Sequence, residues 1–256
     1  MNNKAYESVE QDWARIGVLF GCEPSQRTPD LERLLIDTAR KCPDNARLLP
    51  LAVTWLVEYG QFVARHRLKR LVQTELEHEP QAILGLLVEE AVRHGATREL
   101  LIVSEECHPL SPATPLSRAQ RDNVSLANIS GCRASELAQK WGAWTPPVEL
   151  KPDAVRPVTW LLDQNVDYRE RIIRKGDLRT SILETLRYDL PGCIAPSVLA
   201  LSRLSGATRA AVQKALEALR LEGAICVTAE MTNGRDHAVI LSGATADRSL
   251  RIPCTD

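Results

Sequence analysis

The chain has 256 residues, a formal net charge of -1, 4% aromatic residues and seven cysteines. This length allows one large domain or two ordinary domains, each with its own core. The balanced charge excludes a strongly basic nucleic-acid protein, so any affinity for DNA must come from local charge, and the low aromatic content argues against a base-stacking platform for single strands.

The N-terminal half predicts a series of helices with short connections. Thr28 is a cap residue, a proline follows it and acids fill the next turn, so we expect a helix over 28–41. Nearly continuous apolar residues over 45–59 predict a central helix, and helical spacing predicts two more over 65–77 and 80–94. These elements indicate a compact helical bundle.

Three shorter stretches of this half give less definite predictions. The run Arg65-His-Arg-Leu-Lys-Arg70 is its densest positive segment. As a helix it would spread charge around its circumference, which is typical of a solvated face; contact with the flank of DNA or with an acidic partner is the alternative. Residues 100–103 fit either a strand or a buried helix, and the proline-rich stretch 107–115 predicts a loop.

The middle of the chain predicts a domain boundary. Residues 133–142 have the pattern of the first helix of a helix-turn-helix, but the prolines that follow forbid a second helix directly after it. We therefore expect an ordinary helix that leads into a Pro-rich linker over 145–157. The expected domains are a helical bundle over 1–144 and a C-terminal domain over 158–256, which begins with a helical connection over 158–173.

The C-terminal domain predicts a packing helix, a short helix, a tight turn and a longer helix. The packing helix spans 178–188, and the short helix starts at Leu201 and ends at Gly206. The hydroxyl of Thr208 can cap the longer helix, which runs over 209–222. Its apolar residues recur at helical spacing and form one packed face. The residues on or near the opposite face are Arg209, Ala210, Gln213, Lys214 and Glu217.

The residues after this helix change to the alternation typical of strands. Two short β-prone runs, 224–230 and 237–241, are joined through Asn233-Gly234, the strongest short hairpin signal. Three helices followed by a two-stranded hairpin predict a winged helix-turn-helix with a small β-hairpin wing. The expected fold class is therefore mainly α, with an N-terminal helical bundle and a C-terminal winged helix-turn-helix.

The segment 178–241 resembles the winged helix-turn-helix domains of bacterial transcriptional regulators. Within it, the run 208–225 is most similar to the recognition helix of the GntR-type members. The resemblance covers about a quarter of the chain. The chain departs from the family in two ways: Ala210, Ala211 and Gln213 stand where small hydroxyl residues and a second basic residue are common, and the module is C-terminal rather than N-terminal.

The resemblance implies a set of DNA-binding residues. Arg209, Gln213 and Lys214 would contact bases or nearby phosphates in the major groove. Thr208, which opens the helix, is also expected among the DNA-binding residues. Arg235, in the wing, would contact the backbone. Glutamine can pair with adenine, and arginine or lysine with guanine, so the side chains suit base reading.

A cluster of positive charge precedes the winged helix. Arg174, Lys175 and Arg179, with Arg169 and Arg171 just before them, could form a continuous positive surface with the recognition helix and neutralise several phosphates. The alternative is a set of ordinary solvated helix charges, some of them paired with neighbouring acids.

Motifs for catalysis, metal binding and export are absent from the sequence. We find no phosphate-binding glycine loop, hydrolase nucleophile motif or zinc-protease motif, so we expect no enzyme and no cofactor. The cysteines are scattered singly, which argues against disulfides or a zinc site and for a reducing cytoplasm. The one adjacent pair of soft ligands, Cys107-His108, lacks partners at metal spacing, so we expect no metal. No signal peptide or membrane-spanning run is visible, and we expect a cytoplasmic protein.

These observations predict a sequence-specific DNA-binding transcriptional regulator, acting as a repressor. It would bind double-stranded DNA as a homodimer, while the N-terminal bundle dimerises, binds a protein partner or senses a ligand. Two alternatives remain open. One is a winged-helix adaptor between proteins of a larger complex, and the other is an antitoxin-like or defence-operon regulator that binds both DNA and an associated effector.

Overall fold

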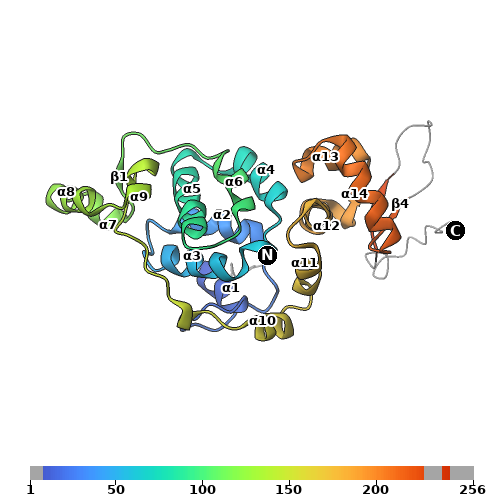
Figure 1. Cartoon of the computed structure of the whole chain (residues 1–256), viewed down its shortest axis with the longest axis horizontal. Coiled ribbons are helices and arrows are strands. Elements are labelled where there is room, and N and C mark those ends of the chain that lie inside the picture. Colours follow the sequence, from blue (N-terminus) through green and yellow to red (C-terminus); the bar gives the residue numbers. More distant parts are fainter. Residues whose placement is uncertain (1–7, 228–237, 243–256) are drawn as a thin grey trace, which may run out of the picture. The chain divides into compact units, whose positions relative to one another are not determined.

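The computed structural model describes residues 8–227 and 238–242 and is mainly helical, with a small antiparallel sheet of three strands (Figure 1). The chain divides into two units. Unit 1 comprises Met1–Val63 and Leu71–Ile173, and unit 2 comprises Ala64–Arg70 and Arg174–Asp256. None of the helices in the described ranges combines the length and the apolarity needed to cross a bilayer.

Unit 1 is built around two buried helices, α3 and α5, as the apolar patterns predict. Nearly all of the α3 side chains are buried, and α5 contacts α2, α3 and the later helices α6 and α9. Pro50 lies in the first turn of α3, where a backbone N–H has no partner within the helix, so it does not break the helix. The helices of this first part are α1 (Val9–Arg15), α2 (Leu31–Lys41), α3 (Leu48–Tyr59), α4 (Arg65–Glu75) and α5 (His78–Arg93), with a 3-10 turn η1 (Gly60–Phe62) after α3.

Helix α2 begins two to three residues later than the sequence predicts. Its cap is Asp30, whose carboxylate accepts a hydrogen bond from the backbone N–H of Arg33 at 3.3 Å. The predicted cap, Thr28, instead donates its hydroxyl to Oδ1 of Asn165 at 3.1 Å. The Thr28 side chain, which the local pattern assigned to the helix cap, is thus engaged in a long-range hydrogen bond instead.

The remainder of unit 1 consists of short elements. Residues 100–103 are helical rather than a strand, and α7 and α8 were not predicted. Strands β1 and β2 pair in parallel over two residues each. These elements are η2 (Arg98–Leu100), α6 (Leu101–Ser104), β1 (Thr114–Pro115), α7 (Arg118–Arg121), α8 (Val124–Arg133), α9 (Glu136–Trp141), β2 (Ala143–Trp144), η3 (Pro152–Ala154), α10 (Val158–Gln164) and α11 (Tyr168–Arg174).

Residues 158–173 belong to unit 1, whereas the sequence analysis placed them with the C-terminal domain. The side-chain amide of Asn165 donates to the carbonyl of Arg15 at 3.0 Å. Arg171 is buried and forms an ion pair with Glu32, with Nη1 and Oε1 2.7 Å apart. These contacts hold α10 and α11 against α1 and α2. Local periodicity in the sequence does not reveal such long-range contacts.

The C-terminal part of unit 2 contains helices α12, α13 and α14 and the antiparallel sheet. Strand β5 lies between β3 and β4, and the register pairs Ile240 with Ile194 on one side and with Cys226 on the other. The short strand β3 was not predicted. The elements are α12 (Leu178–Tyr188), η4 (Pro191–Cys193), β3 (Ile194–Ala195), α13 (Val198–Ser205), α14 (Arg209–Leu221), β4 (Ile225–Val227) and β5 (Val239–Leu241).

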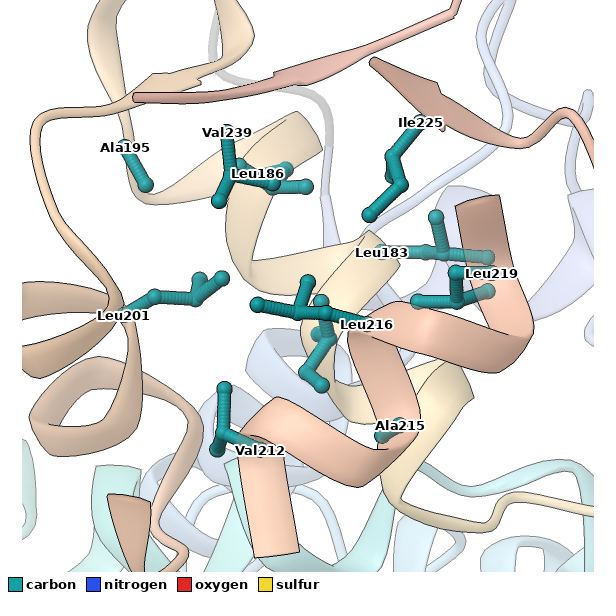
Figure 2. Packing of buried hydrophobic residues seen from close by; sticks show 11 residues of the cluster. Leu183, Leu186, Ala195, Leu201, Val212, Ala215, Leu216, Leu219, Ile225 and Val239 are labelled. Carbon is teal, nitrogen blue, oxygen red and sulfur yellow. The ribbon is translucent and has the colours of Figure 1, made fainter. Parts of the chain in front are cut away.

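A single hydrophobic cluster joins these elements of unit 2 (Figure 2). It takes side chains from α12, α13 and α14 and from each strand of the sheet, so these helices and strands share one core. The members are Ile182, Leu183, Leu186, Ala195, Leu201, Val212, Ala215, Leu216, Leu219, Ile225 and Val239.

The positive run at the start of α4 also belongs to unit 2, and its prediction as a solvated face is wrong. Arg67 is fully buried; its Nε and Nη2 donate to the two carboxylate oxygens of Asp189 at 2.8 and 2.9 Å. Arg70 donates to the same carboxylate at 2.9 Å. The Arg67 guanidinium also lies over the ring of Tyr188, 5.5 Å from its centre. The acidic partner of this run is thus within the chain.

Candidate nucleic-acid interface

The turn between α13 and α14 is built as the sequence predicts. Gly206 ends α13 in the left-handed conformation, with φ of 73°, which a glycine adopts without strain. The hydroxyl of Thr208 accepts a hydrogen bond from the backbone N–H of Ala211 at 3.4 Å and so caps α14. A Cβ at position 206 would overlap the carbonyl oxygen of His66, so the close approach of α4 also requires glycine here.

Helix α14 has one packed face and one exposed face. Figure 2 shows the packed side chains of α14 directed into the hydrophobic cluster, and they are almost fully buried. They are Val212, Ala215, Leu216 and Leu219. This agrees with the predicted apolar face and fixes the rotation of the helix, which leaves the opposite side accessible.

Three of the predicted DNA-binding residues lie on this accessible side. Arg209, Gln213 and Lys214 are all exposed. Within the described residues, no hydrogen bond or ion pair engages any of these three side chains. Their polar groups are therefore available to an external partner. The two exposed alanines beside them, Ala210 and Ala211, have short side chains, so a partner can approach the helix backbone closely.

Two further exposed cations of the α13–α14 unit were not predicted from the sequence. Arg220 is exposed and follows Gln213 by seven residues, which places it on the same flank of α14 as Gln213 and Arg209. Arg203 is exposed on α13. The helical spacing of Arg220 was a signal that could have identified it. The exposed face of α14 thus holds three cations, Arg209, Lys214 and Arg220, against one acid, Glu217.

The expected continuous positive surface ahead of α12 is not formed, because its arginines are paired with acids. Arg174 is only 8% exposed, and its Nη2 lies 2.8 Å from Oε2 of Glu222. Arg179 contacts both Asp177, Nε to Oδ2 at 2.8 Å, and Glu222, Nη1 to Oε1 at 2.7 Å. Glu222 follows Arg209 by 13 residues, about 20 Å along a helix, so these pairs lie at the far end of α14. Lys175, in contrast, is exposed.

These ion pairs also shift the pKa values of the groups involved. Partial burial acts to raise the pKa of Glu222, but hydrogen bonds and charge from Arg174 and Arg179 outweigh it and hold the pKa below its ordinary value. A hydrogen bond to Asp177 is the main reason why the pKa of Arg179 is raised. Both shifts favour the charged forms, so the pairs persist at neutral pH.

The other residues considered for this surface do not join it. Arg171 is buried in the ion pair with Glu32, and Nη2 of Arg169 lies 4.0 Å from Oδ1 of Asp163, both within unit 1. Arg235, the predicted contact of the wing, lies outside the described residues.

The described part of the chain holds no group of three His, Cys, Asp or Glu side chains arranged to bind a metal. Cys107 is buried, and its Sγ contacts the carbonyl of Val103 at 3.4 Å. Burial, with a smaller effect from the charges of Glu106 and Glu89, raises the pKa of the Cys107 thiol to about 12. A thiol that stays protonated at neutral pH is a poor nucleophile, and the burial of Cys107 suits a packing role.

No protein-family model, curated protein or solved structure matches this chain. The geometry of α13 and α14 and the chemistry of their exposed side chains are therefore what indicate an interface.

Proposed function

We propose that this protein is a sequence-specific DNA-binding transcriptional regulator, acting as a repressor, and that unit 2 is a winged helix-turn-helix. The order α12, β3, α13, α14, β4, β5 supports this proposal, because a winged helix places its hairpin directly after the second helix of the helix-turn-helix. The sheet order, with β5 between β3 and β4, fits the same topology.

The observation that carries the proposal is the exposed, unpaired set Arg209, Gln213 and Lys214 on a helix whose other face is core. The 13 residues of α14 span about 20 Å, and the major groove of B-DNA admits one helix. Bidentate hydrogen bonds from glutamine to adenine, or from arginine and lysine to guanine, would read the sequence. Ala210 and Ala211 would let the helix backbone approach the bases closely.

We propose that phosphate contacts come from the exposed cations Arg203, Arg220 and Lys175 rather than from Arg174 and Arg179, which are paired with acids. A single module makes few such contacts, so we propose that a cytoplasmic homodimer binds two half-sites and doubles their number. Occupation of a promoter by this dimer would repress transcription without any catalytic chemistry.

Alanine substitutions on α14 test this function. In fluorescence anisotropy with a duplex from the protein's own promoter, Arg209→Ala and Lys214→Ala should each weaken binding about tenfold or more, because one bidentate base contact contributes about 1–3 kcal/mol. Lys140→Ala is the matched control, since it removes a cation of unit 1 that pairs with Glu89. Equal affinities for all three variants would contradict a role for α14 in DNA binding.

A protein–protein adaptor is the second candidate, and one observation favours it. Leu221 is 84% exposed on the accessible side of α14, and Leu199 of α13 is 41% exposed. Large exposed apolar side chains are typical of protein contacts. If Leu221→Glu abolishes copurification of a partner in a fixed ratio while DNA binding is weak and without sequence preference, the adaptor is the better account.

A further inference from the structure

Helix α14 presents one acid among the residues that we propose to read DNA. Glu217 is exposed, whereas Leu216 and Leu219, before and after it, are directed into the core of unit 2 (Figure 2). Glu217 follows Gln213 by four residues and Lys214 by three, so these side chains are neighbours on one side of the helix. Glu217 therefore belongs to the accessible face of α14.

The carboxylate of Glu217 has no partner in the part of the chain that the structure describes. Lys214 and Arg220 lie three residues before and after it, yet neither forms an ion pair with it, and no hydrogen bond engages it. Glu222, which directly follows α14, differs in this respect, because it accepts hydrogen bonds from two arginines at 2.8 and 2.7 Å. Internal ion pairs thus account for Glu222 but leave the two acceptor oxygens of Glu217 free.

An acid on this face has different effects on the two kinds of DNA contact. Phosphates repel it, which weakens binding to every sequence alike. At a base edge, a carboxylate can only accept hydrogen bonds. In the major groove, cytosine shows a single hydrogen-bonding group, the N4 amino donor. Guanine shows only acceptors there, thymine shows the O4 acceptor and a methyl group, and adenine places its N7 acceptor beside the N6 donor. Cytosine is therefore the base that a free carboxylate fits best.

We propose that Glu217 is a specificity-determining residue, whose carboxylate accepts a hydrogen bond from N4 of a cytosine in the DNA site. At other sequences the carboxylate meets phosphates or acceptor atoms without a compensating hydrogen bond, so it also lowers the affinity for competing sites. The inference rests on the proposed function, because it requires α14 to enter the major groove. It adds to that function the identity of one base and a repulsive element against the wrong sequences.

Replacement of one base pair at a time measures this role. In fluorescence anisotropy with the full chain, derivatives of the promoter duplex compete with the promoter duplex itself. For the wild type, replacement of one C·G pair should weaken binding about tenfold, the usual cost of a lost base contact. Glu217→Ala should discriminate little at that pair and should keep the wild-type preferences elsewhere. Glu217→Gln should prefer A·T at the same position, because glutamine pairs with adenine.

Glu136→Ala is the matched control, since it removes an exposed acid from α9 in unit 1 and should keep every preference of the wild type. If Glu217→Ala keeps the wild-type loss at every C·G pair, or binds all duplexes more tightly by one factor, the carboxylate reads no base. Either result would overturn this inference while DNA reading by α14 stands. If the wild type discriminates at no position, the proposed function is contradicted and the inference falls with it.

Discussion

Substitution of Gly206 by alanine examines the turn that positions α14. The residue has φ of 73°, and a side chain in this left-handed region costs about 1–2 kcal/mol. The added Cβ would also overlap the carbonyl oxygen of His66, which forces the backbone of α4 or of the turn to move. Forced packing of this kind costs a further 1–3 kcal/mol or so. We therefore expect a loss of about 2–5 kcal/mol in the stability of this part of unit 2.

Gly223→Ala separates the two contributions. Gly223 has nearly the same backbone conformation, with φ of 70°, but a Cβ there meets no atom within 4 Å. This variant should lose only the conformational part, about 1–2 kcal/mol. Native-state hydrogen exchange, read on peptides covering α13 and α14, gives the opening free energy of both variants locally, which suits a chain with two units. Equal losses in the two variants would refute the close approach of His66 to the turn.

Three further predictions concern buried pairs, pH and thiols. Asp189→Ala leaves Arg67 and Arg70 without their carboxylate and should lower the free energy of unfolding by about 3–5 kcal/mol. Asp44→Ala removes an exposed ion pair with Arg118 and should lower it by at most about 1 kcal/mol. Urea titration of both variants measures the two losses. The pKa of Glu222 is lowered in the folded state, so its contribution to stability is present at neutral pH and is lost as the pH falls through the folded pKa. The difference in the free energy of unfolding between wild type and Glu222→Gln should therefore shrink below about pH 4. Burial raises the pKa of the Cys42 and Cys107 thiols to about 12, so alkylation followed by mass spectrometry should label the exposed cysteines first; rapid labelling of either buried thiol in the folded protein would contradict this placement.

Local patterns in the sequence predicted α12, the turn between α13 and α14, and the start of α14, whereas α13 begins at Val198, before the predicted start at Leu201. The bounds of α12 are those predicted, and Gly206 and Thr208 end one helix and cap the next as expected. These features depend on residues a few positions apart, so the information is local. Helix α8 shows where this fails, since its pattern is not strongly amphipathic and the ring that packs beside Gly131 belongs to Trp144, outside the helix.

Long-range ion pairs account for the main errors of the sequence analysis. Arg67 and Arg174 were read as surface charge, but acids more than 40 residues away, Asp189 and Glu222, bind them within unit 2. A single sequence shows that a residue is charged and does not show which distant acid it meets. The exposed set on α14 was predictable because the packed face of the same helix defines it.

The most direct test of the central claim is competition between two duplexes for the wild-type protein. One duplex carries the protein's own promoter and the other a scrambled sequence of the same composition, each measured at low and at near-physiological salt. Sequence reading by α14 predicts a preference for the promoter that persists at the higher salt, because base contacts depend less on counterion release than phosphate contacts do. Equal binding to both duplexes that disappears at the higher salt would contradict the account.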